Sequence, residues 1–342
     1  MRIESADLDL GNLQVFPGFI NAHDHLQFAL FPRLGAGPYA NATEWARDIY
    51  HPEEDPIREQ LLVPKHLRLI WGGLRNLLCG VTTVSHHDPY DPIFDSDFPV
   101  RVVKRYGWAH SFAFTKDVQR CFEETPAGAP FLIHLAEGTD SAAAEEIFRL
   151  AEFGAIGRHT VLIHAVGLTP EGWDLVKRAG ASVIWCPRSN LFTLGWTLTL
   201  DAIRSGVPLA LGTDSPITAE GDLLDEIRFA RESFGLSNEE VCELVTSRPR
   251  EILRLPAQPD DWIAAEDFGS PPELAVCGGR IRLIAPRLAD ALPPDLRRQF
   301  HPLRIAGRPR VLVRWKIQQL LQDTRQFLGH SPIRLGGREV LE

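Results

Sequence analysis

Long hydrophobic runs and an excess of positive charge are both missing from this sequence, and each absence excludes a class of protein. No apolar run reaches the roughly 18 residues that a membrane span needs, and the first ten residues contain no apolar signal core. Lys and Arg total 36 against 45 Asp and Glu, which gives a net charge of -9. Nucleic-acid-binding proteins normally carry a basic balance or stripe. We therefore expect a cytoplasmic protein with neither a membrane nor a nucleic acid as its partner.

Cysteine is also scarce, with five residues in a chain of 342. The odd count, the wide spacing and the lack of a CxxC pair argue against a disulfide framework. We expect each cysteine to be a small buried hydrophobe. The five are Cys79, Cys121, Cys186, Cys242 and Cys277.

What the sequence does contain is a series of short apolar runs, each ending in a polar or charged residue. Runs rich in Val, Ile, Phe and Thr are typical of strands buried on both faces. Helical patterns separate most of them, at 56–78, 141–153, 170–179 and 222–234, and this alternation predicts parallel βαβ units. The seven runs occupy residues 15–25, 80–88, 107–117, 130–138, 159–167, 181–190 and 206–215.

These elements predict an α/β fold, a (β/α)8 TIM-like barrel over residues 12–255. A complete barrel has eight strands, so either a short strand lies in 100–103 or one βα unit is abbreviated. The pattern changes after Leu255, where we expect a hairpin around Gly278-Gly279 and an amphipathic helix over 310–328. Residues 1–11 and 256–342 are then a small terminal appendage.

Polar groups at the ends of the predicted strands are the main functional signal. His23 and His25 are two residues apart on one strand, so both side chains face the same way. His134, His164 and Asp214 each follow an apolar run, at the strand ends where barrel enzymes place their active sites. Titratable groups buried together need pairing or a metal, and imidazole with carboxylate suits zinc or iron. The alternative is a set of separate core histidines, each hydrogen-bonded locally.

Four further residues are weaker candidates. Glu137 lies three residues after His134, where a carboxylate beside a metal can shuttle protons; the alternative is a solvated loop carboxylate. Gln27 could read the edge of a heterocycle, His87 could line the pocket, and Asn190 could orient a ring, so these three are candidate substrate contacts. A hydrogen-bonded loop cluster is the competing interpretation of 86–88.

Taken in order, the segments PGFINAHDHL, GVTTV, HLAE, the lone His164, CPRSN and GTDS resemble the amidohydrolase superfamily. The resemblance covers about residues 12–255 and is nearest to the branch of cytosine, guanine and adenosine-type deaminases and triazine hydrolases. It implies four metal ligands, an acid–base Glu137 and a polarising His164. It also implies a β-sandwich built from both termini, which we expect here only as a remnant around 1–10 and 272–284. The implied ligands are His23, His25, His134 and Asp214.

The resemblance implies a metal-dependent hydrolase that attacks an sp² carbon of a small nitrogen heterocycle with a metal-activated water. Catalysis would use Glu137, His164 and Asp214, with one divalent zinc or iron. A deaminase that releases ammonia is the first expectation, acting on a small-molecule substrate and compatible with a homo-oligomer. One alternative is a ring-opening hydrolase of cyclic amides or amidines, binuclear if Lys116 bridges two metals. Another is a degenerate barrel that binds without turnover.

Overall fold

A computed structural model describes residues 1–4, 6–329 and 331–341, and its centre is a set of short parallel strands. They form a three-stranded sheet in the order β4-β5-β6 and a five-stranded sheet in the order β11-β10-β9-β8-β7. A parallel bridge between Asp24 and Asp214 connects the two sheets at their β4 and β11 edges. The predicted α/β class with parallel strands is therefore confirmed. The strands are β4 (Phe19–Asp24), β5 (Val81–His86), β6 (Arg101–Val102), β7 (Gly107–Ala109), β8 (Phe131–Leu135), β9 (Thr160–His164), β10 (Ser182–Trp185) and β11 (Leu209–Leu211).

The extra strand expected in 100–103 exists as β6, but no helix follows it. Only residues 103–106 separate β6 from β7. A crossover between neighbouring parallel strands usually takes a dozen or more residues, and among the described residues no ladder of hydrogen bonds joins β6 to β7. β6 pairs with β5, and β7 pairs with β8. One βα unit is thus abbreviated.

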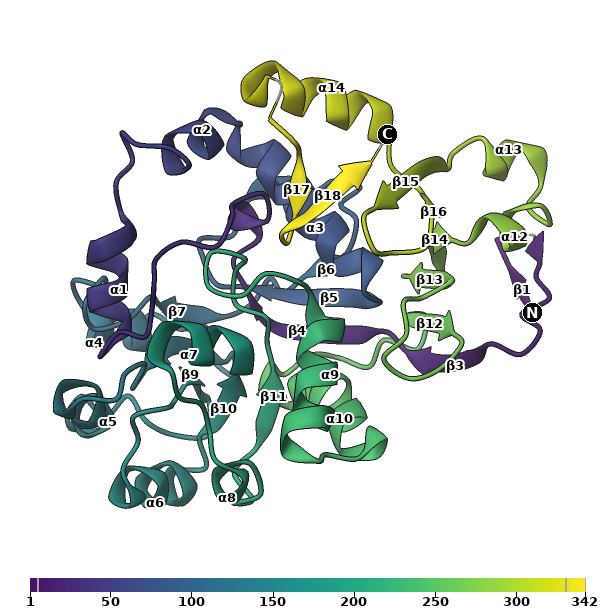
Figure 1. The fold of residues 1–342 in the computed structure, drawn as a ribbon. Coiled ribbons are helices and arrows are strands. Elements are labelled where there is room, and N and C mark those ends of the chain that lie inside the picture. Colours follow the sequence, from purple (N-terminus) through teal and green to yellow (C-terminus); the bar gives the residue numbers. More distant parts are fainter. Residues whose placement is uncertain (5, 330, 342) are drawn as a thin grey trace.

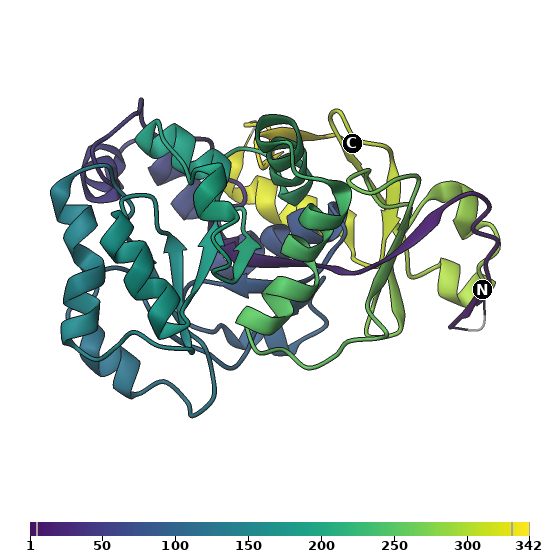
Figure 2. The ribbon, with the colours of Figure 1, turned by 90° about the horizontal axis from the view of Figure 1, so that it is seen from below.

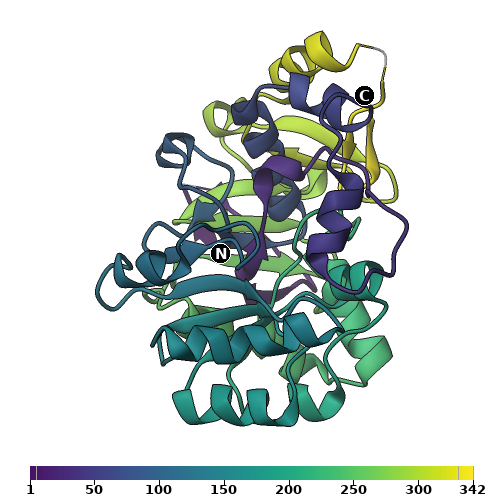
Figure 3. The same cartoon turned by 90° about the vertical axis from the view of Figure 1, so that its left-hand side faces the viewer.

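Helices flank the parallel strands, as Figures 1 and 3 show. The pattern over 56–78 forms two helices, not one, because Pro64 begins the second helix and disfavours helical backbone at Val63. Both Asp222 and Ser237 cap the helices that follow them in complete capping boxes. The helices are α1 (Ala42–Ile49), α2 (Ile57–Leu62), α3 (Lys65–Leu78), α4 (Val118–Glu123), α5 (Ser141–Glu152), α6 (Pro170–Ala179), α7 (Pro187–Leu194), α8 (Leu200–Ile203), α9 (Leu223–Phe234), α10 (Asn238–Val245) and α11 (Ser247–Ile252), with short 3-10 helices at Leu26–Phe28 and Pro92–Asp95.

The terminal segments build an eight-stranded sheet in the order β17-β18-β15-β16-β14-β13-β12-β3, larger than the predicted hairpin and helix. Figure 2 shows it, with the N-terminus, at the end of the molecule away from α5 and α6. The hairpin at Gly278-Gly279 is confirmed. The strands of the eight-stranded sheet are β3 (Gln14–Pro17), β12 (Trp262–Ala265), β13 (Leu274–Cys277), β14 (Arg280–Ile284), β15 (His301–Ile305), β16 (Val311–Val313), β17 (Arg334–Leu335) and β18 (Arg338–Leu341). The terminal segments also contain β1 (Arg2–Ile3), β2 (Ala6–Asp7), α12 (Pro286–Ala289), α13 (Pro294–Arg297) and α14 (Ile317–Leu328).

Two boundaries predicted from the sequence are wrong. The first predicted strand, 15–25, divides at Gly18 into β3 of the antiparallel sheet and β4 of the parallel one. A Cβ at Gly18 would lie 2.2 Å from Thr82 Oγ1, so only glycine fits at this division. The helix predicted over 310–328 begins at Ile317, because Val311–Val313 pairs with β14 and β15.

The core lies on both faces of the parallel strands. Every residue of β4, β5, β8 and β9 is buried, as continuous apolar runs predict for such strands. Cys79, Cys186 and Cys277 are buried as expected, whereas Cys121 and Cys242 are partly exposed, and all five are free thiols. Among the described residues, no helix has both the length and the hydropathy of a membrane span.

Candidate metal centre and active site

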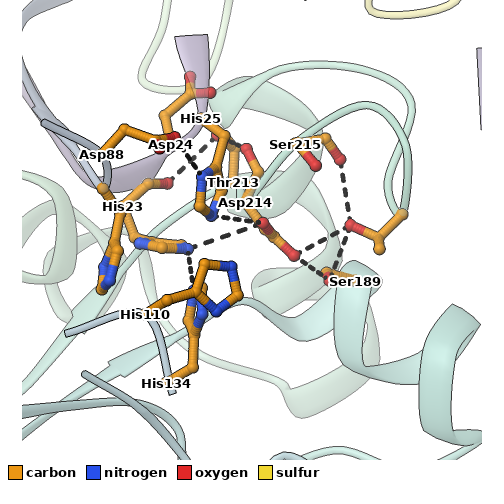
Figure 4. A network of polar contacts seen from close by, with 12 residues as sticks. His23, Asp24, His25, Asp88, His110, His134, Ser189, Thr213, Asp214 and Ser215 are labelled. Carbon is orange, nitrogen blue, oxygen red and sulfur yellow. Dashed lines mark hydrogen bonds and ion pairs between the residues drawn. The ribbon is translucent and has the colours of Figure 1, made fainter. Parts of the chain in front are cut away.

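His23 and His25 leave the carboxyl end of β4 on the same side of the strand, as their spacing predicts, and both rings are buried. His134 lies in β8 and Asp214 just after β11, so the four groups come from three strands. Figure 4 shows them pointing toward one another. The Nε2 atoms of His23 and His134 are 3.1 Å apart. Asp214 Oδ1 lies 3.6 Å from Nε2 of His23 and 3.7 Å from Nε2 of His25.

These separations fit the first coordination shell of a metal. Bonds of 2.0–2.1 Å in a tetrahedral zinc site place neighbouring ligand atoms about 3.3 Å apart. Two buried imidazole nitrogens facing each other otherwise require a proton between them. Burial, opposed by Asp214, lowers the pKa of His23 to about 3, so the neutral, ligand-competent form is favoured. The donor set suits zinc or iron(II).

Asp214 is held by two hydroxyl groups. Ser189 Oγ donates to its Oδ2 at 2.6 Å, and Thr218 Oγ1 donates to the same oxygen at 3.0 Å. The other oxygen therefore faces the histidines. Burial alone would raise the pKa of Asp214, but His23, His164 and His25 hold it well below its ordinary value, so this group is a carboxylate.

Asp88 orients His25. Its Oδ2 lies 3.2 Å from Nδ1 of His25 and also accepts from Gln27 Nε2. Ligating histidines usually give their second ring N–H to a carboxylate in this way. Burial opposes the ionisation of Asp88, but His25 keeps its pKa well below the usual value. Nδ1 of His23 and Nδ1 of His134 have no hydrogen-bond partner among the described residues.

Glu137 and His164 form a second pair beside the first group. Oε1 of Glu137 is 3.5 Å from Nε2 of His164, and Nδ1 of that ring is 2.6 Å from Asn190 Oδ1. Burial and the charges of Asp214 and Glu146 raise the pKa of Glu137 well above its ordinary value. Asp214, which is ionised, and the neighbouring Glu137, which favours its proton, can therefore serve as base and acid.

A cavity of about 240 Å³ opens beside Glu137 and His134. Its other walls come from α1, from the loop after β7 and from the start of α5. Gln27, His87 and Asn190 are not among its lining residues. Gln27 instead holds Asp88, Asn190 holds His164, and His87 stacks on His134 with ring centroids 4.5 Å apart. The walls include Asn41, Thr43, Glu44, Arg47, His110, Ser111, Phe114 and Glu146.

The sequence-based prediction missed His110 and Glu146 as cavity residues. His110 follows β7 directly, so the signal that identified His134 was present there too: a polar residue ending an apolar run. Glu146 lies on α5, and no pattern around it distinguishes it from the neighbouring Glu145. Lys116, considered as a metal bridge, is exposed.

Known proteins share both sequence and fold with this chain, although no family model matches it. An aminodeoxyfutalosine deaminase of Deinococcus radiodurans is 38% identical over 87 residues, 25% of this chain and 21% of the relative. A 5-methylthioadenosine/S-adenosylhomocysteine deaminase of Thermococcus onnurineus is 23% identical over 283 residues, 66% of this chain and 65% of the relative. The chain thus spans less than two thirds of either relative.

Among solved structures, a zinc-bound adenosine deaminase of Xanthomonas campestris matches with a TM-score of 0.65 and 15% identity, covering 92% of this chain and 85% of the other. At this identity the match shows the fold. Together with the two deaminase relatives, it confirms the resemblance to the amidohydrolase superfamily that the ordered motifs predict.

Proposed function

We propose that this chain is a metal-dependent deaminase of a small nitrogen heterocycle, in which His23, His25, His134 and Asp214 hold one divalent metal. The observation that carries the proposal is the Glu137–His164 pair, 3.5 Å apart, beside two metal-compatible groups that share His23. One group is His23, His25 and Asp214, and the other is His23, His134 and His164. A protein that only binds a ligand has no need of a proton-shuttling carboxyl next to a metal centre. The relatives named as deaminases support the same reaction.

When bound, a divalent metal would lower the pKa of a water toward about 7 and supply the nucleophile for attack on an sp² ring carbon. Zinc is the favoured ion, since the donors suit it and the Xanthomonas deaminase binds it. Iron(II) suits the same donors.

The residues then divide the proton transfers between them. Asp214, ionised and held by Ser189 and Thr218, would orient the water and accept its proton together with His164. Glu137, whose pKa is raised, would donate a proton to the ring nitrogen as that atom becomes basic. Glu137, then ionised, would take the remaining proton of the added hydroxyl and pass it to the amine, so that ammonia leaves. The proton accepted from the water would finally return to Glu137. Asn190 would orient His164, and Asp88 would orient His25. Gln27 donates a hydrogen bond to Asp88, and His87 stacks on His134.

The architecture that fits this role is a closed (β/α) barrel with one abbreviated unit, formed by about residues 12–255. The antiparallel sheet would then be the β-sandwich that the superfamily resemblance implies, fuller than a remnant. We further propose a cytoplasmic enzyme with a small-molecule substrate, no nucleic-acid partner, and assembly as a homo-oligomer.

Ammonia release by the purified, zinc-loaded protein tests the proposal. A panel of purines, pyrimidines, pterins and triazines should contain a substrate whose deamination stops on removal of the metal and resumes on its return. Glu145→Gln, which changes an exposed carboxylate on α5, is the control for a Glu→Gln change at Glu137 and should leave the rate unchanged. Ring opening without ammonia would favour the cyclic amidase, and tight ligand binding without any turnover would overturn the proposal.

A further inference from the structure

Glu146 reaches from α5 back to the end of β8. Its Oε2 accepts a hydrogen bond of 2.7 Å from the backbone N–H of Ala136, the residue directly before Glu137. Glu146 also lines the cavity into which Glu137 faces. The proposed function gives Glu146 no role, although it is the side chain that contacts the backbone beside the proton shuttle.

Ala136 has an unusual backbone conformation. Its φ is 52°, in the left-handed region that residues with a Cβ rarely adopt, and the residue is fully buried. Such a conformation persists only where surrounding contacts hold it. Here the carbonyl of Ala136 accepts from Gly167 N at 2.8 Å, and its N–H donates to Glu146.

The left-handed residue decides where Glu137 points. A strand that continued past Leu135 would place residue 137 on the same side as Leu135, on the face that packs against the helices. The turn at Ala136 redirects the chain, and the carboxyl of Glu137 comes to lie against His164. On the other side of the turn, the carbonyl of Glu137 accepts from Ala42 N at 2.9 Å, which ties it to α1.

We propose that Glu146 is a positioning residue, which fixes the left-handed turn at Ala136 and so aims the carboxyl of Glu137 at the reacting atoms. This role rests on the proposed function, because it takes Glu137 as the proton shuttle. It requires a hydrogen-bond acceptor at the end of the Glu146 side chain and does not require its charge.

Four variants separate this role from its alternatives. Glu146→Leu removes the acceptor, Glu146→Asp keeps the charge but shortens the reach, Glu146→Gln keeps an acceptor of the same length, and Glu145→Leu is the matched control on the same helix. The readouts are kcat, KM, metal content and hydrogen exchange at the amide of Ala136. The exchange readout needs no substrate, so it reports on the turn even if the chain is not a deaminase.

We expect Glu146→Leu and Glu146→Asp to speed hydrogen exchange at the Ala136 amide, which loses its acceptor, and to lower kcat by up to about 100-fold, the scale of a small misplacement of a catalytic group. KM and metal content should change little, and Glu146→Gln should recover most of the kcat. Unchanged exchange in both Glu146→Leu and Glu146→Asp would overturn the proposal. So would a rise in KM at constant kcat, which marks a substrate contact, or a Glu146→Gln variant as slow as Glu146→Leu.

Discussion

The Nε2 atoms of His23 and His134 lie 3.1 Å apart, although the two residues are 111 positions apart in sequence and lie on strands that are not neighbours. Both rings are buried, and a carboxylate oxygen of Asp214 lies 3.6 Å from the His23 nitrogen. Two unprotonated ring nitrogens that face each other in the interior repel, and this lowers the stability of the folded state. The cost is offset when a cation binds between them, and this makes metal binding the first property to test.

Metal-loaded protein should contain about one zinc or iron per chain, because the two metal-compatible groups that contain the proposed ligands share His23 and so surround one point. His25→Ala and Asp214→Asn should lose metal and activity together. Elemental analysis of the loaded protein measures both points. A ratio of two metals in the same site would contradict the single centre, and a variant with full metal and full turnover would remove that residue from the ligand set.

Asp88→Asn should weaken metal binding without abolishing it. The amide can no longer stabilise the N–H of His25 with a negative charge, and such changes behind a ligand typically cost 10–100-fold in affinity. Competition with a chelator measures the difference. Asp91→Asn is a suitable control, because the side chain of Asp91 caps the 3-10 helix of Pro92–Asp95 and forms an ion pair with Lys65 at 4.0 Å, and neither contact involves a histidine. Equal affinities in the two variants would show that Asp88 does not support His25.

Stability should depend on pH through Glu226. Burial, opposed by Arg188, raises the pKa of this carboxyl from its usual 4.5 to about 8. The folded state therefore holds the proton more tightly than the unfolded state. Its contribution to the free energy of unfolding is fully present below pH 4.5 and is lost as the pH rises toward about 8.

Denaturant titration of wild type and Glu226→Gln at several pH values measures this effect. The variant, which cannot ionise, should lose less stability than wild type between pH 5 and 8. Glu232→Gln, at an exposed position of the same helix, should behave as wild type. Parallel curves for wild type and Glu226→Gln would contradict the raised pKa.

The positions of the four proposed metal ligands could be predicted from sequence because each one lies at the end of an apolar run, and strand periodicity alone places His23 and His25 on one side. The positions of Gln27 and Asn190 could not, because their partners Asp88 and His164 are distant in sequence and depend on how the loops fold. Glu146 was missed for the same reason: its hydrogen bond joins a helix to the residue after a strand. The antiparallel sheet was underestimated because its strands are short and its pairing joins β3 to segments some 250 residues later.

The proton shuttle is the centre of this account, and Glu137→Gln tests it most directly. The amide keeps the shape of the side chain but carries no transferable proton, so kcat on the substrate found by ammonia release should fall by about 10²–10⁴-fold. Metal content and KM should stay near the wild-type values. A variant that keeps its metal and a near-normal kcat would contradict the account, and loss of the metal would show instead that Glu137 is a ligand.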